Sequence, residues 1–323
     1  MRVEHYDEPA KHSWDYFVRQ SKNGTFLFLR DYMDYHRDRF RDCSLLIYDD
    51  RDDLVALLPA SRCDSRFASH PGLTYGGLVT QRSAKLPMVL QIFERTVAYL
   101  QAEGIQTFSY STIPSIYHRV PAEEDRYALY LANARLTRRG VLCVIGSEHL
   151  PFQERRSRGA KKAEKAGVVV RQSEDWKPYW EIITDRLLAN FKSAPVHQLS
   201  EIEFLAATFP DCIKLFAAYE GSVLIAGVVI YETDLVARAQ YIAASDRGQE
   251  LSAIDLIFAR LLFGCYANKR YFEFGTSDEE GGIRVNKGLI DQKEGYGARV
   301  LAHDHYVIDV AACVPDQFVA ALR

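Results

Sequence analysis

Residues 272–299 read FEFGTSDEEGGIRVNKGLIDQKEGYGAR, and ordinary side-chain packing explains this stretch least well. It begins like a strand, because aromatic residues that favour extended structure precede Gly275. A polar loop is expected to follow. Near its end, Gly295 and Gly297 give the backbone unusual freedom on both sides of an aromatic residue. The stretch therefore predicts a loop from which Lys293 reaches a ligand.

A second unusual stretch, residues 155–165, is strongly basic. Six of its residues are Arg or Lys, in a chain whose formal net charge is −3. Arg155, Arg158 and Lys162 recur at steps of three or four residues, so a helix would place them in one cationic stripe. The concentration of positive charge in an acidic protein favours an anionic ligand over a merely solvated face.

The expected elements occur twice in the same order. A hairpin, a strand, a helix and a polar-ended strand are expected at residues 43–59, 73–79, 85–103 and 105–110, and again at 213–231, 236–244, 251–267 and 271–275. A period of about 165 residues is too long for a solenoid and indicates two related domains. The expected domains are residues 1–150 and 151–323, with a hairpin at residues 127–146 and the basic helix opening the second domain.

Composition excludes several classes of protein. With 48% hydrophobic residues, 323 residues are enough to bury a core in each domain. The longest apolar runs are far shorter than the roughly 20 residues of a membrane span, and the charged N-terminus lacks a secretory apolar segment, so a cytoplasmic location is expected. The six cysteines and nine histidines have no disulfide-type or metal-type spacing, so neither a disulfide framework nor a metal site is expected.

The two unusual stretches together resemble the Fem-related acyltransferases, which are tandem-GNAT proteins with two acetyltransferase-like folds in one chain. The resemblance rests on the FEFGTS segment, the Asn286-Lys-Gly-Leu segment and the closing QKEGYG, and on the basic helix with its K-A-E-x-x-G ending at residues 162–167. It implies an α/β fold with two GNAT-like domains and mixed central sheets. It also implies an N-acyltransferase.

The resemblance further implies where an acyl donor binds. In acetyltransferase folds two strands splay apart, and the extended donor pairs with an exposed edge. The amides of Ile242 and Ala243 would then face the acyl carbonyl, and Arg247 and Gly248 would lie where a helix N-terminus holds the pyrophosphate of acyl-CoA. The segment that begins at Arg247 has one glycine where the pyrophosphate-binding loop of acetyltransferases usually has two, and an acidic residue follows that glycine. Aminoacyl-tRNA, the donor of Fem enzymes, is therefore the alternative to acetyl-CoA.

Three residues are predicted to be catalytic: Lys293, Tyr241 and Ser277. The ammonium of Lys293 would stabilise negative charge that develops during transfer. The hydroxyls of Tyr241 and Ser277 would serve the leaving group or the attacking amine. An equal alternative for Tyr241 is an ordinary packed residue of a strand.

The acceptor implied by the resemblance is an amine on a sugar- or peptide-containing cell-envelope precursor, linked to a nucleotide or a lipid, as in envelope polysaccharide biosynthesis. Its predicted contacts are Arg155, Arg158, Lys162, Tyr75, Asn286 and Tyr296, with the basic residues on phosphate. A competing interpretation, from another class, is a catalytically silent tandem GNAT protein that binds a nucleotide or RNA through the basic helix.

Overall fold

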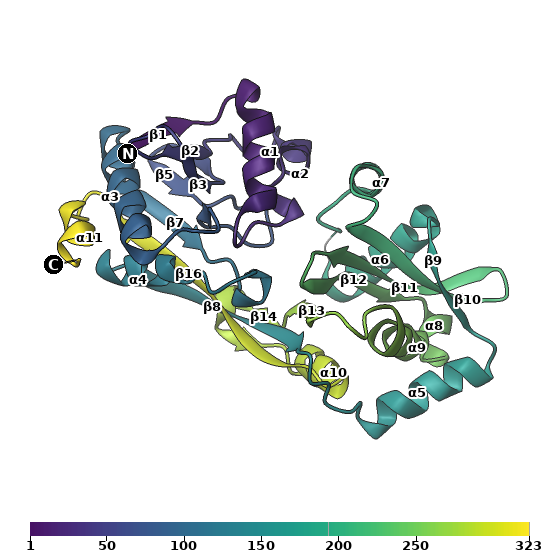
Figure 1. Ribbon diagram of the computed structural model, residues 1–323. Coiled ribbons are helices and arrows are strands. Elements are labelled where there is room, and N and C mark those ends of the chain that lie inside the picture. The colour runs from purple at the N-terminus through teal and green to yellow at the C-terminus, as the bar shows by residue number, and fades with distance from the viewer. Residues whose placement is uncertain (193, 323) are drawn as a thin grey trace. The chain divides into compact units, whose positions relative to one another are not determined.

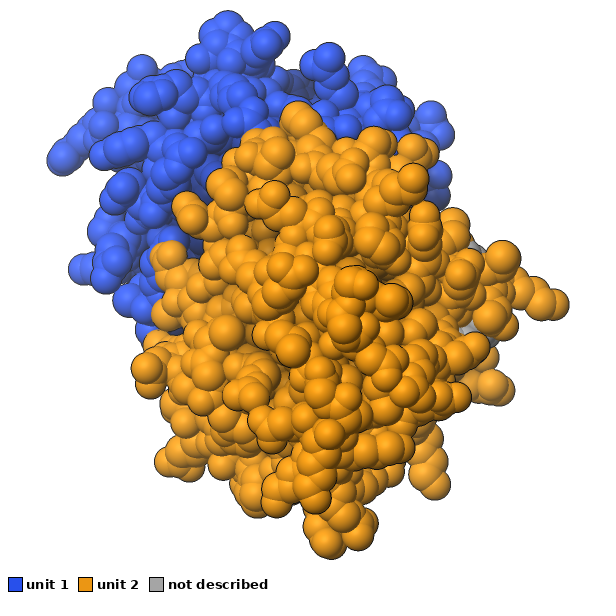
Figure 2. All heavy atoms as spheres, turned by 90° about the vertical axis from the view of Figure 1, so that its right-hand side faces the viewer, with its two compact units in different colours: residues 1–140, 302–323 blue, residues 141–301 orange. Residues whose placement is uncertain are grey.

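The chain forms two compact units in the computed structural model, which describes residues 1–192 and 194–322 (Figures 1 and 2). Unit 1 contains residues 1–140 and 302–323, and unit 2 contains residues 141–301. The chain leaves unit 1 within β8 (Arg135–Ile145) and returns within β16 (Arg299–Asp309). This division differs from the expected 1–150 and 151–323, because β16 pairs with β7 (Thr107–Ser111) and so joins the C-terminal segment to unit 1.

Unit 1 contains a small sheet of strand order β1-β2-β3-β6 and a run of strands in the order β4-β5-β7-β16. Apolar side chains of β2, β3, α3, β7 and β16 form its core. Its other elements are β1 (Arg2–His5), α1 (Lys11–Gln20), α2 (Arg30–Met33), β2 (Leu45–Tyr48), β3 (Leu54–Leu58), β4 (Ser61–Cys63), β5 (Arg66–Ala68), β6 (Val79–Thr80), α3 (Leu86–Ala102), α4 (Glu124–Leu131) and α11 (Asp316–Ala320).

Two expectations for unit 1 are wrong. The predicted hairpin at residues 127–146 is instead helix α4 followed by the single strand β8, because the apolar side chains of α4 pack against α3. The predicted strand at residues 73–79 is reduced to β6. Residues 127–146 alternate in polarity well enough to suggest strands, but tertiary packing decides the structure of both segments.

Unit 2 has strands in the order β8-β13-β12-β11-β10-β9, parallel only between β12 and β13. Helix α9 packs on one face through the core it shares with the sheet, and Tyr179 of α6 packs on Gly227 on the other face. The elements are α5 (Glu154–Lys165), β9 (Val169–Ser173), α6 (Trp176–Phe191), α7 (Leu199–Thr208), β10 (Ile213–Glu220), β11 (Val223–Glu232), β12 (Val236–Ala244), α8 (Asp246–Glu250), α9 (Ala253–Arg260), a π-helical turn (Leu261–Cys265), β13 (Tyr271–Thr276), β14 (Asp278–Glu279), β15 (Arg284–Val285) and α10 (Lys287–Gly295).

The two parallel strands of unit 2 separate part of the way along their length. Their last paired rung joins Arg238 of β12 to Glu273 of β13, although both strands continue. Just beyond it, the register of β12 shifts against β11, and the register of β13 shifts against β8 where Gly275 adopts φ +75°. Such bulges bend a strand away from its neighbour. We call this point of separation the fork.

Helix α10 replaces the loop that the sequence predicts before residue 298. Asn286 caps it, since its side-chain oxygen accepts a hydrogen bond from the Leu289 amide at 3.0 Å. After the helix, Gly297 adopts φ +93°, and a Cβ on it would lie 2.4 Å from the carbonyl oxygen of Leu150. This glycine therefore ends a packed helix. It does not free a loop.

No helix among the described residues is both long and apolar enough to cross a membrane.

Candidate active site

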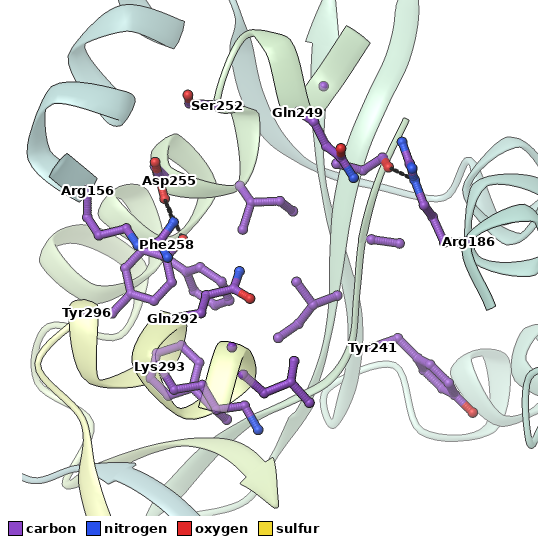
Figure 3. Close-up of a pocket in the computed structure, with 18 of the residues that line it drawn as sticks. Arg156, Arg186, Tyr241, Gln249, Ser252, Asp255, Phe258, Gln292, Lys293 and Tyr296 are labelled. Atoms are coloured by element: carbon purple, nitrogen blue, oxygen red, sulfur yellow. Dashed lines mark hydrogen bonds and ion pairs between the residues drawn. The ribbon is translucent and has the colours of Figure 1, made fainter. Parts of the chain in front are cut away.

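A pocket of about 600 Å³ lies entirely within unit 2, at the fork (Figure 3). Its walls come from the ends of β12 and β13, the segment from α8 to α9, and helices α5, α6 and α10. Polar lining groups are supplied by Arg156, Arg186, Tyr241, Gln249, Ser252, Asp255, Gln292, Lys293 and Tyr296, and apolar ones by Ile183, Leu187, Ile242, Ile254, Phe258, Phe274 and Leu289. The pocket therefore offers an apolar surface with a few convergent polar groups, as ligand sites generally do.

Lys293 lies in the wall of this pocket, on helix α10 and not on the predicted loop. The side chain is only 6% exposed, and its Nζ donates hydrogen bonds to the carbonyl oxygens of Gly275, at 3.2 Å, and Thr276, at 2.5 Å. These carbonyls belong to the irregular end of β13, beyond the fork. An ammonium has three donors, so two carbonyl bonds leave one N–H for a ligand.

The charge of Lys293 is destabilised by its surroundings. Burial is the main cause, and it lowers the pKa of the ammonium from 10.5 to about 8. The positive charge of Arg238 lowers this pKa further, whereas Cys143, Glu273 and Asp278 act to raise it. Lys293 is therefore mostly charged at neutral pH and becomes neutral under mildly alkaline conditions.

A second group of polar side chains joins helix α5 to the pocket. Asp255 of α9 accepts hydrogen bonds from Tyr296 Oη at 2.5 Å and from Arg156 Nη1 at 3.2 Å, as Figure 3 shows. The Arg156 guanidinium also lies over the Tyr296 ring, 5.0 Å from its centroid. Close approach of the helices depends on Gly159, because a Cβ there would lie 2.0 Å from Asp255 Oδ2. Tyr296 thus anchors a network of charged groups.

The outward stripe of α5 does not line the pocket. Arg155 pairs with Asp291 at 2.6 Å, and Arg158 lies 3.6 Å from Glu154. Lys162 donates to the backbone oxygen of Glu250 at 2.5 Å. All three predicted phosphate-binding residues are exposed to solvent, while Arg156 on the opposite face of the same helix reaches the pocket.

The two predicted catalytic hydroxyls are not directed into the pocket. Tyr241 lines it, but Figure 3 shows its hydroxyl pointing away from the other labelled residues, and Tyr241 Oη lies 2.5 Å from His197 Nδ1. Ser277 is buried, does not line the pocket and lies 3.4 Å from the sulfur of Cys143. Neither hydroxyl is placed to meet a ligand in this pocket directly.

The predicted donor-binding residues are only partly assembled. Ile242, Ala243 and Gly248 line the pocket, whereas Arg247 is exposed and pairs with Glu220 at 2.6 Å and with Glu250 at 3.1 Å. A Cβ at Gly248 would lie 2.2 Å from the oxygen of Ile225 on β11. Gly248 is therefore needed for packing, and Arg247 forms surface ion pairs.

The segment from α8 to α9 is a poor fit for the pyrophosphate of acyl-CoA. Two of its amides are already engaged: Gly248 donates to the Ser245 hydroxyl, and Gln249 donates to the Ser245 carbonyl. Arg186 Nε also donates to the carbonyl of Ala244 at 2.6 Å, on the strand edge where an extended donor would pair. A pyrophosphate or a pantetheine arm would have to displace these bonds.

Two predicted acceptor-binding residues also lie outside the pocket. Tyr75 belongs to unit 1, is buried and donates to the Thr25 hydroxyl at 3.0 Å. Asn286 is occupied as the cap of α10, and its amide nitrogen donates to Glu279 at 2.6 Å. Both residues have local structural roles.

Sequence reasoning missed three charged residues of the pocket: Arg156, Arg186 and Asp255. Arg156 lies on the face of α5 that carries the small residues Gly159 and Ala160. A charged residue on a face of small residues was the sequence feature that could have indicated its place in the pocket. Arg186 of α6 and Asp255 of α9 have no comparable signal, because only the fold brings them to the pocket.

The chain matches no protein-family model and no curated protein. Among solved structures it is similar to FemX, with a TM-score of 0.67 and 10% identity over 100% of both chains. It is also similar to the C-terminal domain of a putative lysylphosphatidylglycerol synthetase from Agrobacterium fabrum, with a TM-score of 0.56 and 13% identity over 86% of this chain and 85% of that one. It is also similar to a tandem GNAT protein from the clavulanic acid biosynthesis pathway, with a TM-score of 0.51 and 8% identity over 96% of this chain and 99% of that one. The predicted fold is thus confirmed: the chain has the tandem GNAT fold of the Fem-like proteins.

Proposed function

We propose that this protein is an N-acyltransferase that moves an acyl group from a donor in the unit 2 pocket to an amine of a cell-envelope precursor. The observation that carries this proposal is the position of Lys293. Its buried ammonium lies at the fork, among apolar walls, with one N–H left after its two carbonyl bonds. A preorganised donor in a water-poor site stabilises the oxyanion that acyl transfer creates.

The donor favoured by the site is an aminoacyl ester of tRNA. Engaged amides at Gly248 and Gln249 and the bond from Arg186 to Ala244 weigh against acyl-CoA. The terminal adenosine of an aminoacyl-tRNA needs an apolar surface for its base and cationic groups for its phosphate. The pocket offers both, with Phe258 and Phe274 among its walls and Arg156 at its edge.

In this scheme the residues of the site have separate tasks. Lys293 faces the ester carbonyl, whose oxygen becomes negative as the amine attacks. The ester C–O bond then breaks, and the tRNA leaves with a ribose hydroxyl that carries the proton lost by the amine. Arg156, oriented by Asp255 and Tyr296, holds an anionic group of the donor. Tyr241 shapes the wall through its ring. The acceptor amine is the part of the proposal that rests on the resemblance to Fem enzymes, and it includes sugar and peptide amines of nucleotide-linked precursors.

A transfer assay tests the proposal. The protein is incubated with tRNA charged with isotope-labelled amino acids, or with labelled acetyl-CoA, and with nucleotide-linked peptide and amino-sugar acceptors. Mass spectrometry then detects the amide product. We expect product from aminoacyl-tRNA, loss of product after deacylation of the tRNA, and none from acetyl-CoA. Product from acetyl-CoA alone would reject the proposed donor, and no product from either, with binding of uncharged RNA, would favour the silent RNA-binding interpretation.

A further inference from the structure

A buried ion pair occupies the last rung before the fork. Arg238 Nη1 donates a hydrogen bond to Glu273 Oε1, and Arg238 Nε donates to Gln240 Oε1 at 2.9 Å. The Glu273 side chain is 0% exposed and that of Arg238 is 14% exposed. A buried ion pair is weak evidence for stability, because apolar residues of similar volume often serve as well. The position of this ion pair at the fork therefore indicates a functional role.

The ion pair lies next to the backbone that holds Lys293. Gly275 supplies one of the two carbonyl oxygens that accept from Lys293 Nζ. A Cβ on Gly275 would lie 3.4 Å from Arg238 Nη2, so the guanidinium packs against this same residue. Glu273 precedes it by two positions on β13. The ammonium, the guanidinium and the carboxylate thus surround one short segment of strand.

We propose that Arg238 and Glu273 are positioning residues that set the protonation state of Lys293, an inference that rests on the proposed role of Lys293 in acyl transfer. The two charges act in opposite directions. The positive charge of Arg238 disfavours the ammonium, and the negative charge of Glu273 favours it. Glu273 therefore offsets part of the destabilisation that burial and Arg238 impose on the ammonium, which stays charged at neutral pH.

The titratable groups around Lys293 come from four strands. Arg238 of β12 lowers its pKa, whereas Cys143 of β8, Glu273 of β13 and Asp278 of β14 raise it. Arg238 has a larger influence than Glu273, and burial remains the largest single cause of the lowered pKa. The ion pair as a whole therefore lowers the pKa of Lys293 slightly.

Direct titration of the lysine tests this inference without depending on turnover. The full-length protein is labelled with ¹³C at lysine Cε, the resonance of Lys293 is assigned by its loss in Lys293→Met, and its chemical shift is followed from pH 6 to pH 11. Glu273→Gln should lower the pKa of Lys293, and Arg238→Gln should raise it, each by about one pH unit. The pH above which the transfer rate declines should move in the same two directions.

A purely structural role gives a different result. It would lower the stability of both variants and leave the pKa of Lys293 where it was, which would overturn the inference. If a single variant does not fold, the double variant with both residues changed to Gln carries no unpaired buried charge. It should raise the pKa slightly, and an unchanged or lower value would contradict us. Opposite pKa shifts with an unmoved rate profile would instead reject the proposed role of Lys293.

Discussion

Replacing Lys293 with Met should separate the chemistry of the site from its stability. The substitution removes a buried charge, and the fall of the lysine pKa from 10.5 to about 8 corresponds to about 3 kcal/mol at about 1.4 kcal/mol per pH unit. It also leaves the oxygens of Gly275 and Thr276 without this donor, at about 1–3 kcal/mol each. These effects oppose each other, so at pH 7 the free energy of unfolding should change by no more than about 3 kcal/mol.

The sign of the pH dependence follows from proton binding. Between pH 8 and pH 10.5 the unfolded chain holds a proton on Lys293 that the folded protein has lost, so stability rises with pH in this window. Below pH 8 both states are protonated and the gain is absent. The wild-type protein should therefore gain about 3 kcal/mol relative to Lys293→Met between pH 8 and pH 10.5.

Urea unfolding of both proteins at several pH values measures this difference. The contributions of the other titrating groups cancel, because the two proteins share them. In the transfer assay, Lys293→Met should lower kcat by about 10²-fold or more, on the scale of a lost oxyanion donor. The matched control is Lys287→Met, an exposed lysine of the same helix that does not line the pocket, which should retain both activity and stability. A pH-independent difference in stability, or full activity of Lys293→Met, would refute the reasoning.

Three further predictions concern stability and the wall of the pocket. Burial lowers the pKa of His70 to about 4. Between pH 6.5 and pH 4 the unfolded chain therefore binds a proton on His70 that the folded protein does not, so the free energy of unfolding should fall by up to about 3 kcal/mol as the pH drops through this range. Urea titrations of His70→Phe should show a smaller fall. Gly159→Ala places a Cβ 2.0 Å from Asp255 Oδ2 and should cost about 1–3 kcal/mol in thermal or urea unfolding, unlike Gly264→Ala, where the Cβ meets nothing within 4 Å. Tyr241→Phe removes a hydroxyl that points away from the pocket, so the transfer rate should stay within about threefold; a loss of about 10²-fold would return that hydroxyl to the reaction.

The repeated order of elements was visible in the sequence because apolar periodicity is a local signal. The predicted strand at residues 236–244 coincides with β12, and the predicted basic helix at 155–165 differs from α5 by one residue. By contrast, α10 was hidden in a polar segment whose apolar residues are too few to show a helical period. The pairing of β16 with β7 was equally invisible, because it joins segments almost 200 residues apart.

The candidate site was predictable where a residue lies at the end of a regular element. The resemblance placed Tyr241 and Ala243 at the splayed strands, and the glycines that flank it singled out Lys293; all three line the pocket. The direction of a side chain was harder to foresee. Arg155 and Arg156 are neighbours in the sequence, but a helix turns them to different faces, and only packing against α9 decides which one reaches the pocket.

Hydrogen–deuterium exchange with two competing ligands tests most directly the claim that the unit 2 pocket holds an aminoacyl donor. The ligands are puromycin carrying a 5′-phosphate, a stable amide analogue of the phosphorylated aminoacyl-adenosine that ends a charged tRNA, and coenzyme A. We expect puromycin to protect the amides of α10 and of residues 241–244, and this protection to weaken in Arg156→Ala, whose side chain lines the pocket. Coenzyme A should protect neither segment. Protection of residues 246–253 by coenzyme A, with none by puromycin, would contradict the account.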